Sequence, residues 1–124
     1  MTEERLEKGM KMRRRVLGDA QVDQAEAART EFNSDFVDYF VGSAWGDVWT
    51  RPGLDLRTRS CITVAMLVAL DRPAELRLHL RGALRNGVTQ AELKEILLQA
   101  AVYCGVPAAN DAYRLAQEVI QAEN

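Results

Sequence analysis

The only histidine of this 124-residue chain, His79, follows Glu75 by four residues in a segment rich in arginine. Residues four apart share one face of a helix, so the carboxylate can orient the imidazole and favour its protonated form. Histidine is the one side chain whose unperturbed pKa allows acid and base chemistry near neutrality. The spacing therefore indicates a proton-transfer group near an anion. An ordinary helix ion pair is the alternative interpretation.

Four arginines near this histidine in the sequence are candidates for binding carboxylates. Arg57 and Arg59 precede a long apolar segment and Arg72 follows it. Arg77 lies on the same predicted helix as the histidine. A guanidinium donates paired hydrogen bonds to a carboxylate, and such pairs strengthen where water is excluded. Solvent-facing side chains are the alternative for each arginine taken singly.

Three aromatic residues are candidates for the wall of a pocket. Trp45 and Trp49 lie in a segment, Trp45 to Gly53, whose composition predicts a loop. Half-buried core aromatics are an equally good interpretation of this pair. Tyr103 stands near the predicted end of a helix, before Gly105, and is a weaker candidate for the same wall.

Several chemistries lack their motifs. A single histidine and two distant cysteines, Cys61 and Cys104, offer no zinc-ligand spacing, so we expect no metal site. The eight glycines form neither a phosphate loop nor a dinucleotide fingerprint. A net charge of −2 with nearly balanced acids and bases does not favour nucleic-acid binding. The basic run at residues 11–15 is typical of a solvated or subunit-facing helix end.

The expected location is the cytoplasm, with no membrane association. Neither an apolar leader at the first residues nor an apolar run of about 20 residues is present. Two unpaired cysteines without a secretory signal are typical of reduced thiols in the cytosol.

The periodicity of apolar residues predicts an all-α fold of about six helices in a single domain covering residues 1–124. Thr2 and Gly18 bound a first helix, and Thr89 with Glu92 forms a capping box. The expected helices cover roughly residues 3–17, 23–28, 34–44, 56–71, 74–86, 90–104 and 107 onward. The helix at 56–71 is apolar on every side, which predicts a central position, a subunit interface, or both.

The order and spacing of several motifs across nearly the whole chain resemble the carboxymuconolactone decarboxylase family. The matching segments are Arg14–Gly18 with Val22-Asp23, Trp49–Arg57 with Arg59-Ser60, Glu75–His79, Ala83-Leu84, Asn86-Gly87, Thr89, Glu92, Glu95, Tyr103, Gly105 and Pro107–Ala109.

The resemblance implies the helical fold of the alkylhydroperoxidase D-like proteins and assembly as trimers or hexamers. Those redox relatives carry a C-x-H-C-x-x-x-H motif, whose thiol positions are occupied here by Arg72 and Glu75. A thiol peroxidase needs a thiolate nucleophile, so peroxidase activity is not expected. The implied reaction is loss of carbon dioxide from 4-carboxymuconolactone, a small dicarboxylate lactone, to give 3-oxoadipate enol-lactone in protocatechuate breakdown. No cofactor is implied.

In that reaction we expect His79 to be the proton donor or the oxyanion partner, with Glu75 orienting it. Arg57 and Arg72 are the first candidates for the substrate carboxylates, with Arg59 and Arg77 next, and the two tryptophans would exclude water. Two other functions remain open. One is a non-catalytic oligomer that binds a small acidic ligand, and the other is a decarboxylase of a different lactone or keto acid.

Overall fold

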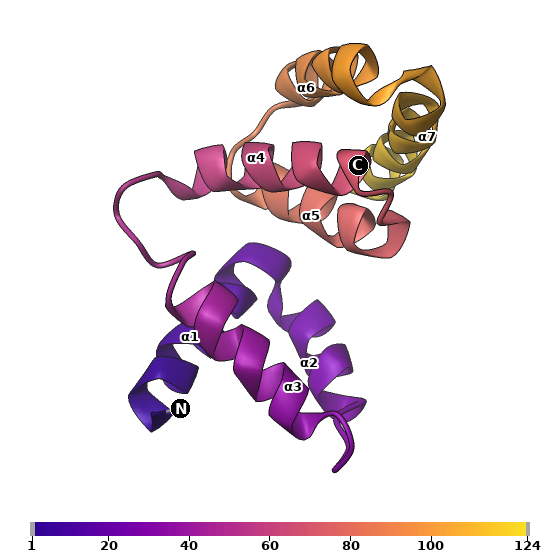
Figure 1. Ribbon diagram of the computed structural model, residues 1–124. Coiled ribbons are helices and arrows are strands. Elements are labelled where there is room, and N and C mark those ends of the chain that lie inside the picture. The colour runs from indigo at the N-terminus through magenta and orange to yellow at the C-terminus, as the bar shows by residue number, and fades with distance from the viewer. Residues whose placement is uncertain (1, 124) are drawn as a thin grey trace. The chain divides into compact units, whose positions relative to one another are not determined.

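The computed structural model describes residues 2–123, and these contain helices and no strand, which confirms the all-α prediction. Residues 2–123 form seven α-helices and one π-helical segment, where about six helices were expected. The chain divides into two compact units, residues 1–55 and 56–124. In chain order the elements are α1 (Glu3–Leu17), α2 (Asp19–Ala27), α3 (Ser34–Phe40), η1 (Val41–Gly46), α4 (Leu56–Ala69), α5 (Pro73–Arg85), α6 (Gln90–Cys104) and α7 (Val106–Glu123) (Figure 1).

In the first unit, α1 begins and ends where its caps predict. The Arg5 amide donates to the Thr2 hydroxyl at 3.2 Å, and Gly18 ends the helix at a φ of +90°. Helix α1 packs on η1, where Gly9 lies against the backbone carbonyl of Val41. A side chain at position 9 would overlap that carbonyl, so this close helix contact requires glycine.

Three expected boundaries in this unit were wrong. Helix α2 begins at Asp19, not at Asp23, because the left-handed Gly18 turns the chain directly into a new helix. The predicted helix at 34–44 changes at Val41 into wider π turns, in which the Asp47 amide donates to the Gly42 carbonyl at 2.9 Å. Trp45 therefore belongs to η1, and the expected loop starts only at Asp47.

The basic run on α1 is not simply solvated, as had been expected. Arg13 is only 8% exposed, and its guanidinium lies 5.2 Å from the centre of the Phe40 ring, a cation–π contact. Burial lowers the pKa of this arginine. Arg14 instead pairs with Asp23 at 2.8 Å, at the surface.

In the second unit, α4 and α5 pack side by side in opposite directions, and α6 and α7 complete the core (Figure 1). The predicted capping box is confirmed, because the Glu92 amide donates to the Thr89 hydroxyl while the Thr89 amide donates to the Glu92 carboxylate. Fully or nearly buried apolar residues from all four helices form one cluster, which includes Val64, Leu80, Leu97, Ala116 and Val119.

Helix α4 is less enclosed than its sequence predicted. Its buried residues are Ser60, Val64 and Val68, whereas Ile62 and Met66 are 38% and 58% exposed, and Leu70, directly after the helix, is 61% exposed. Burial on all sides is therefore wrong for the chain by itself, and a subunit interface stays a prediction. Among residues 2–123, no helix has the length and apolar character that crossing a bilayer would require.

Candidate functional site

Helix α5 positions the histidine. Pro73 occupies the first turn, where its missing amide hydrogen is not needed, and Leu76, Leu80 and Ala83 face the core. His79 lies on the flank of this buried stripe and is itself partly buried. Its helical neighbours on the same face are Glu75, which is exposed one turn before it, and Gly82, which is buried.

The same face of α5 contacts α4 through a polar pair. The Asn86 side-chain amide donates to the hydroxyl of Ser60 at 2.9 Å, and Ser60 is fully buried. Residues 79 and 86 are seven apart and so lie on one side of the helix. Asn86 caps α5, so this hydrogen bond joins the end of the helix that carries the histidine to α4.

Burial lowers the pKa of His79 to about 4, because desolvation disfavours the charged imidazolium. The negative charge of Glu75 raises the pKa of His79, as expected from the sequence, but this effect is smaller than that of burial. The imidazole is therefore neutral at neutral pH. The sequence indicated the favourable carboxylate correctly and gave no sign of the larger desolvation.

A neutral imidazole carries one N–H donor and one acceptor nitrogen. As a donor it can hydrogen-bond to an oxygen that gains negative charge during a reaction, without placing a full positive charge beside a bound carboxylate. Its acceptor nitrogen can take a proton. The geometry thus supports an oxyanion partner more directly than a cationic acid.

Two of the candidate arginines already have carboxylate partners. Arg57, at the start of α4, forms an ion pair with Glu92 of the capping box. Arg77, on α5, pairs with Glu118 of α7 at 2.6 Å, and both side chains are more than a third exposed. Surface pairs of this kind contribute about 0–1 kcal/mol, so an incoming substrate carboxylate can replace either partner at low cost.

Arg59 and Arg72 lie in different surroundings. Arg59 is partly buried in the first turns of α4. Arg72 is the exposed residue immediately before α5, and no ion pair is formed by it within the described part of the chain. Of the four, Arg72 is the most accessible to a carboxylate in solution.

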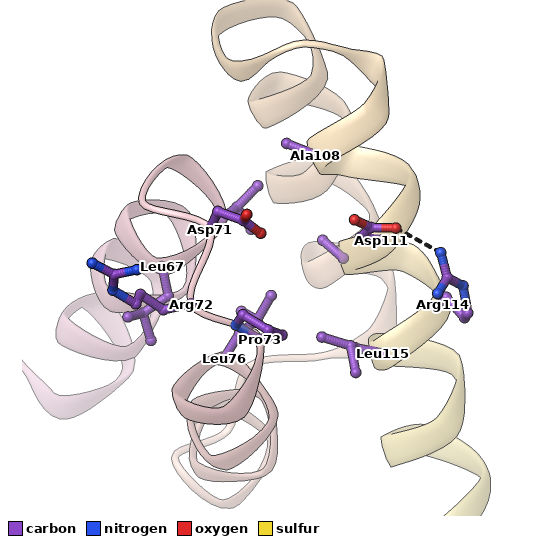
Figure 2. A pocket seen from close by; sticks show the side chains of 11 residues that line it. Leu67, Asp71, Arg72, Pro73, Leu76, Ala108, Asp111, Arg114 and Leu115 are labelled. Atoms are coloured by element: carbon purple, nitrogen blue, oxygen red, sulfur yellow. Dashed lines mark hydrogen bonds and ion pairs between the residues drawn. The ribbon is translucent and has the colours of Figure 1, made fainter.

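A cavity of about 260 Å³ opens between the α4–α5 turn and α7 (Figure 2). The carboxylates of Asp71 and Asp111 face each other across it, while the Arg72 guanidinium points away, on the side of α4. Arg114 pairs with Asp111 at 2.6 Å and points outward. Two carboxylates and two guanidinium groups, those of Arg72 and Arg114, are therefore among the groups that line this cavity.

The three aromatic candidates belong to two different compact units. Trp45 and Trp49 are 6% and 9% exposed and stack on each other with ring centres 5.0 Å apart. They are core residues of the first unit, which agrees with the second of the two interpretations of this pair. Tyr103, on α6 in the second unit, is 82% exposed and lies beside a separate cavity between α4 and α6. That any of these aromatics walls the substrate pocket stays a prediction.

Sequence reasoning missed the buried Ser60–Asn86 pair. Both Ser60 and Asn86 belong to segments that match the family, but their spacing predicts no contact between them. The available signal was Ser60, a polar residue directly before a segment of apolar residues. A hydroxyl buried at such a place normally has a hydrogen-bond partner. No cluster of three or more histidine, cysteine, aspartate or glutamate side chains suited to a metal ion occurs among the described residues.

Residues 34–118 match the model of the carboxymuconolactone decarboxylase family. A 4-carboxymuconolactone decarboxylase from Acinetobacter baylyi is 45% identical over 119 residues, which cover 96% of this chain and 89% of that protein. The nitrosuccinic acid decarboxylase npaB from Metarhizium robertsii is 41% identical over 114 residues, 92% of this chain and 80% of that protein. The family match includes residues of both compact units.

Proposed function

Because the chain belongs to the carboxymuconolactone decarboxylase family, we propose that it is a carboxy-lyase that converts 4-carboxymuconolactone into 3-oxoadipate enol-lactone and carbon dioxide without a cofactor. The observation that carries the proposal is 45% identity to a 4-carboxymuconolactone decarboxylase along 96% of the chain. Such coverage includes the helix with the histidine, the candidate arginines and both compact units.

The chemistry needs only groups that side chains provide. When the carboxylate leaves as carbon dioxide, its bonding electrons move through the ring double bond to the lactone carbonyl, which becomes an oxyanion. A carbon atom is then protonated to give the product. Hydrogen-bond donors fixed at the oxyanion supply about 3–4 kcal/mol, and a placed proton donor accelerates such steps by about 100- to 10,000-fold.

His79 supplies the donor at the oxyanion in this proposal. Its neutral state is consistent with that role, since a neutral imidazole donates its N–H without binding the substrate carboxylate tightly in the ground state. Glu75, one turn away, orients the ring and partly opposes the effect of burial on its pKa. When a dianion binds nearby, its charge raises the histidine pKa further, so that a proton can be taken up for delivery to carbon.

The arginines hold the substrate. Arg72 is the first candidate for the retained carboxylate because it is exposed and outside any ion pair in residues 2–123, and Arg57 is the second. Arg59 and Arg77 rank behind them. The leaving carboxylate must be held more weakly than the retained one, because an ion pair that stabilises the ground-state anion opposes its loss.

The test is turnover of freshly prepared 4-carboxymuconolactone by the purified protein after dialysis against a chelator, followed by carbon dioxide release and enol-lactone absorbance. His79→Gln should lower kcat by about 100-fold or more while the circular dichroism spectrum is unchanged. Arg72→Gln should raise KM, whereas Arg114→Gln, which removes an exposed arginine outside the candidate set, should change neither constant. A folded His79→Gln protein with full turnover would contradict the assignment of the histidine.

A second substrate is favoured by one specific observation. A relative 41% identical along 92% of this chain is a nitrosuccinic acid decarboxylase, which acts on a dicarboxylic acid without a lactone ring. Nitrosuccinate should therefore be assayed beside 4-carboxymuconolactone. Turnover of nitrosuccinate alone would assign the chain to a different carboxy-lyase reaction, and binding of either acid without turnover would favour the non-catalytic alternative.

The proposal includes assembly as a trimer or hexamer in the cytoplasm. The exposed apolar residues Met66 of α4 and Leu70, which directly follows this helix, support a subunit contact, because exposed large apolar side chains that lie together mark interaction surfaces. Light scattering on the purified protein measures the mass directly. A monomer of 13.9 kDa at micromolar concentration would rule out the assembly.

A further inference from the structure

A second cavity, of about 330 Å³, lies entirely within the second unit, between α4 and α6. Helix α4 contributes Cys61, Ile62 and Ala65 to it, and α6 contributes a stripe that includes Ile96, Ala100 and Cys104. Both cysteines of the chain therefore line one cavity, although 43 positions separate them. The inner wall of this cavity is part of the packed core, because Ala100 belongs to the buried core and both cysteines pack against that core.

The chemistry of this lining differs from that of the cavity beside Asp71. None of the residues that line it is charged, and the amide of Gln99 and the hydroxyl of Tyr103 are its only neutral hydrogen-bonding side chains other than the thiols. A charged ligand would lose its hydration here without gaining an ion pair, which costs several kcal/mol. The dianionic substrate proposed above is therefore excluded from this cavity, and His79 is not among its lining residues.

The volume of the α4–α6 cavity and its two thiols indicate which kind of ligand it can bind. Cavities of about 150 Å³ lined by apolar side chains bind benzene, so a space of 330 Å³ accommodates a molecule of one or two rings. Thiol sulfur is polarizable and packs well against aromatic faces. Tyr103, 82% exposed at the edge of the cavity, offers an aromatic ring that can cover a bound ligand.

We propose that the α4–α6 cavity is a binding site for a small uncharged molecule with one or two aromatic rings, held between Cys61 and Cys104. The site is separate from the decarboxylation chemistry and does not rest on it. Gln99 supplies the one amide that can hydrogen-bond to a substituent on the ring.

The test uses N-phenyl-1-naphthylamine, an uncharged fluorescent two-ring probe, with the intact wild-type chain. We expect saturable binding of one probe per chain. Ala65→Phe fills the cavity and should raise the probe Kd by about tenfold or more. Ala69→Phe, which adds the same ring to an exposed position of the same helix outside the lining, is the matched control and should leave Kd unchanged. An absence of saturable binding, or equal Kd values in wild type and Ala65→Phe, would overturn the proposal.

A second measurement does not require any variant to fold. The uncharged alkylating reagent monobromobimane should modify both cysteines of the wild-type protein, and a saturating concentration of the probe should slow both reactions by about tenfold. Peptide mass spectrometry reports each cysteine separately. If another copy of the chain covers the cavity, both thiols will be unreactive and the probe will not bind, which would refute the ligand site in favour of a buried subunit contact. Protection of only one thiol would also contradict a ligand held between the two.

Discussion

Acidification should destabilise this protein through His79. Its pKa is about 4 in the folded chain, against 6.5 for an unperturbed histidine. Between these two values the unfolded chain binds more protons than the folded one, so stability is fully present above about pH 6.5 and decreases as the pH falls toward 4.

The size of the effect follows from the same two values. At pH 4.5 an unfolded histidine is almost fully protonated, whereas the folded one is about one quarter protonated. Each pKa unit corresponds to about 1.4 kcal/mol, so lowering the pH from 7 to 4.5 should remove about 2 kcal/mol of unfolding free energy through this residue. That is a large part of the stability of a small domain.

Urea unfolding of wild type and His79→Gln at pH 7.0 and pH 4.5 isolates this contribution. The carboxylates titrate in both proteins, so the difference between the two pH effects belongs to the histidine. Since His79 is the only histidine, its single Hε1 resonance in a proton NMR titration gives the folded pKa independently. A midpoint at or above 6.5, or the same pH dependence of stability in both proteins, would refute the assignment of a desolvated imidazole.

Three further outcomes are expected. Gly9→Ala should lower the stability of the first unit by about 2–3 kcal/mol, measured by tryptophan fluorescence in urea, because the new methyl group overlaps the Val41 carbonyl. Gly53→Ala, which has no atom within 4 Å of its new methyl group, should be neutral in the same assay. Asp71→Gly should raise the unfolding free energy by about 1 kcal/mol, since Asp71 has a φ of +54° that only glycine adopts without strain. Arg57→Gln should raise KM by about tenfold while kcat changes little, and an unchanged KM would remove this arginine from the substrate site.

Helix boundaries were predictable where their signals are local. Thr2, the Thr89–Glu92 capping box and Gly105 act on backbone groups within four residues, so the sequence alone located the ends of α1 and α6. The π-helical segment Val41–Gly46 was not predictable in this way. It packs against α1 at Gly9, more than thirty residues earlier in the chain, and no periodicity within residues 34–46 reports that contact.

The sequence nominated candidate residues for a site but did not report their electrostatics. The four-residue spacing of Glu75 and His79 correctly indicated an interacting pair on one helix face. The desolvation that dominates the histidine pKa arises from packing between helices, which one helix period does not encode. The partners of Arg57 and Arg77 likewise lie 35 and 41 positions away, on other helices. Local spacing could nominate these arginines and could not show that carboxylates already neutralise them.

A neutral histidine is well matched to decarboxylation. A permanent positive charge beside the leaving carboxylate would stabilise the substrate most strongly before reaction, and that stabilisation would have to be given up as carbon dioxide departs. An imidazole held neutral by burial avoids this ground-state attraction and gains strength as negative charge moves onto the lactone oxygen. In the role that we propose for His79, the desolvation that lowers its pKa also strengthens its hydrogen bond to that oxygen, because electrostatic interactions grow as water is excluded. Burial of this one residue thus weakens the protein in acid and, in the proposed mechanism, favours the reaction near neutrality.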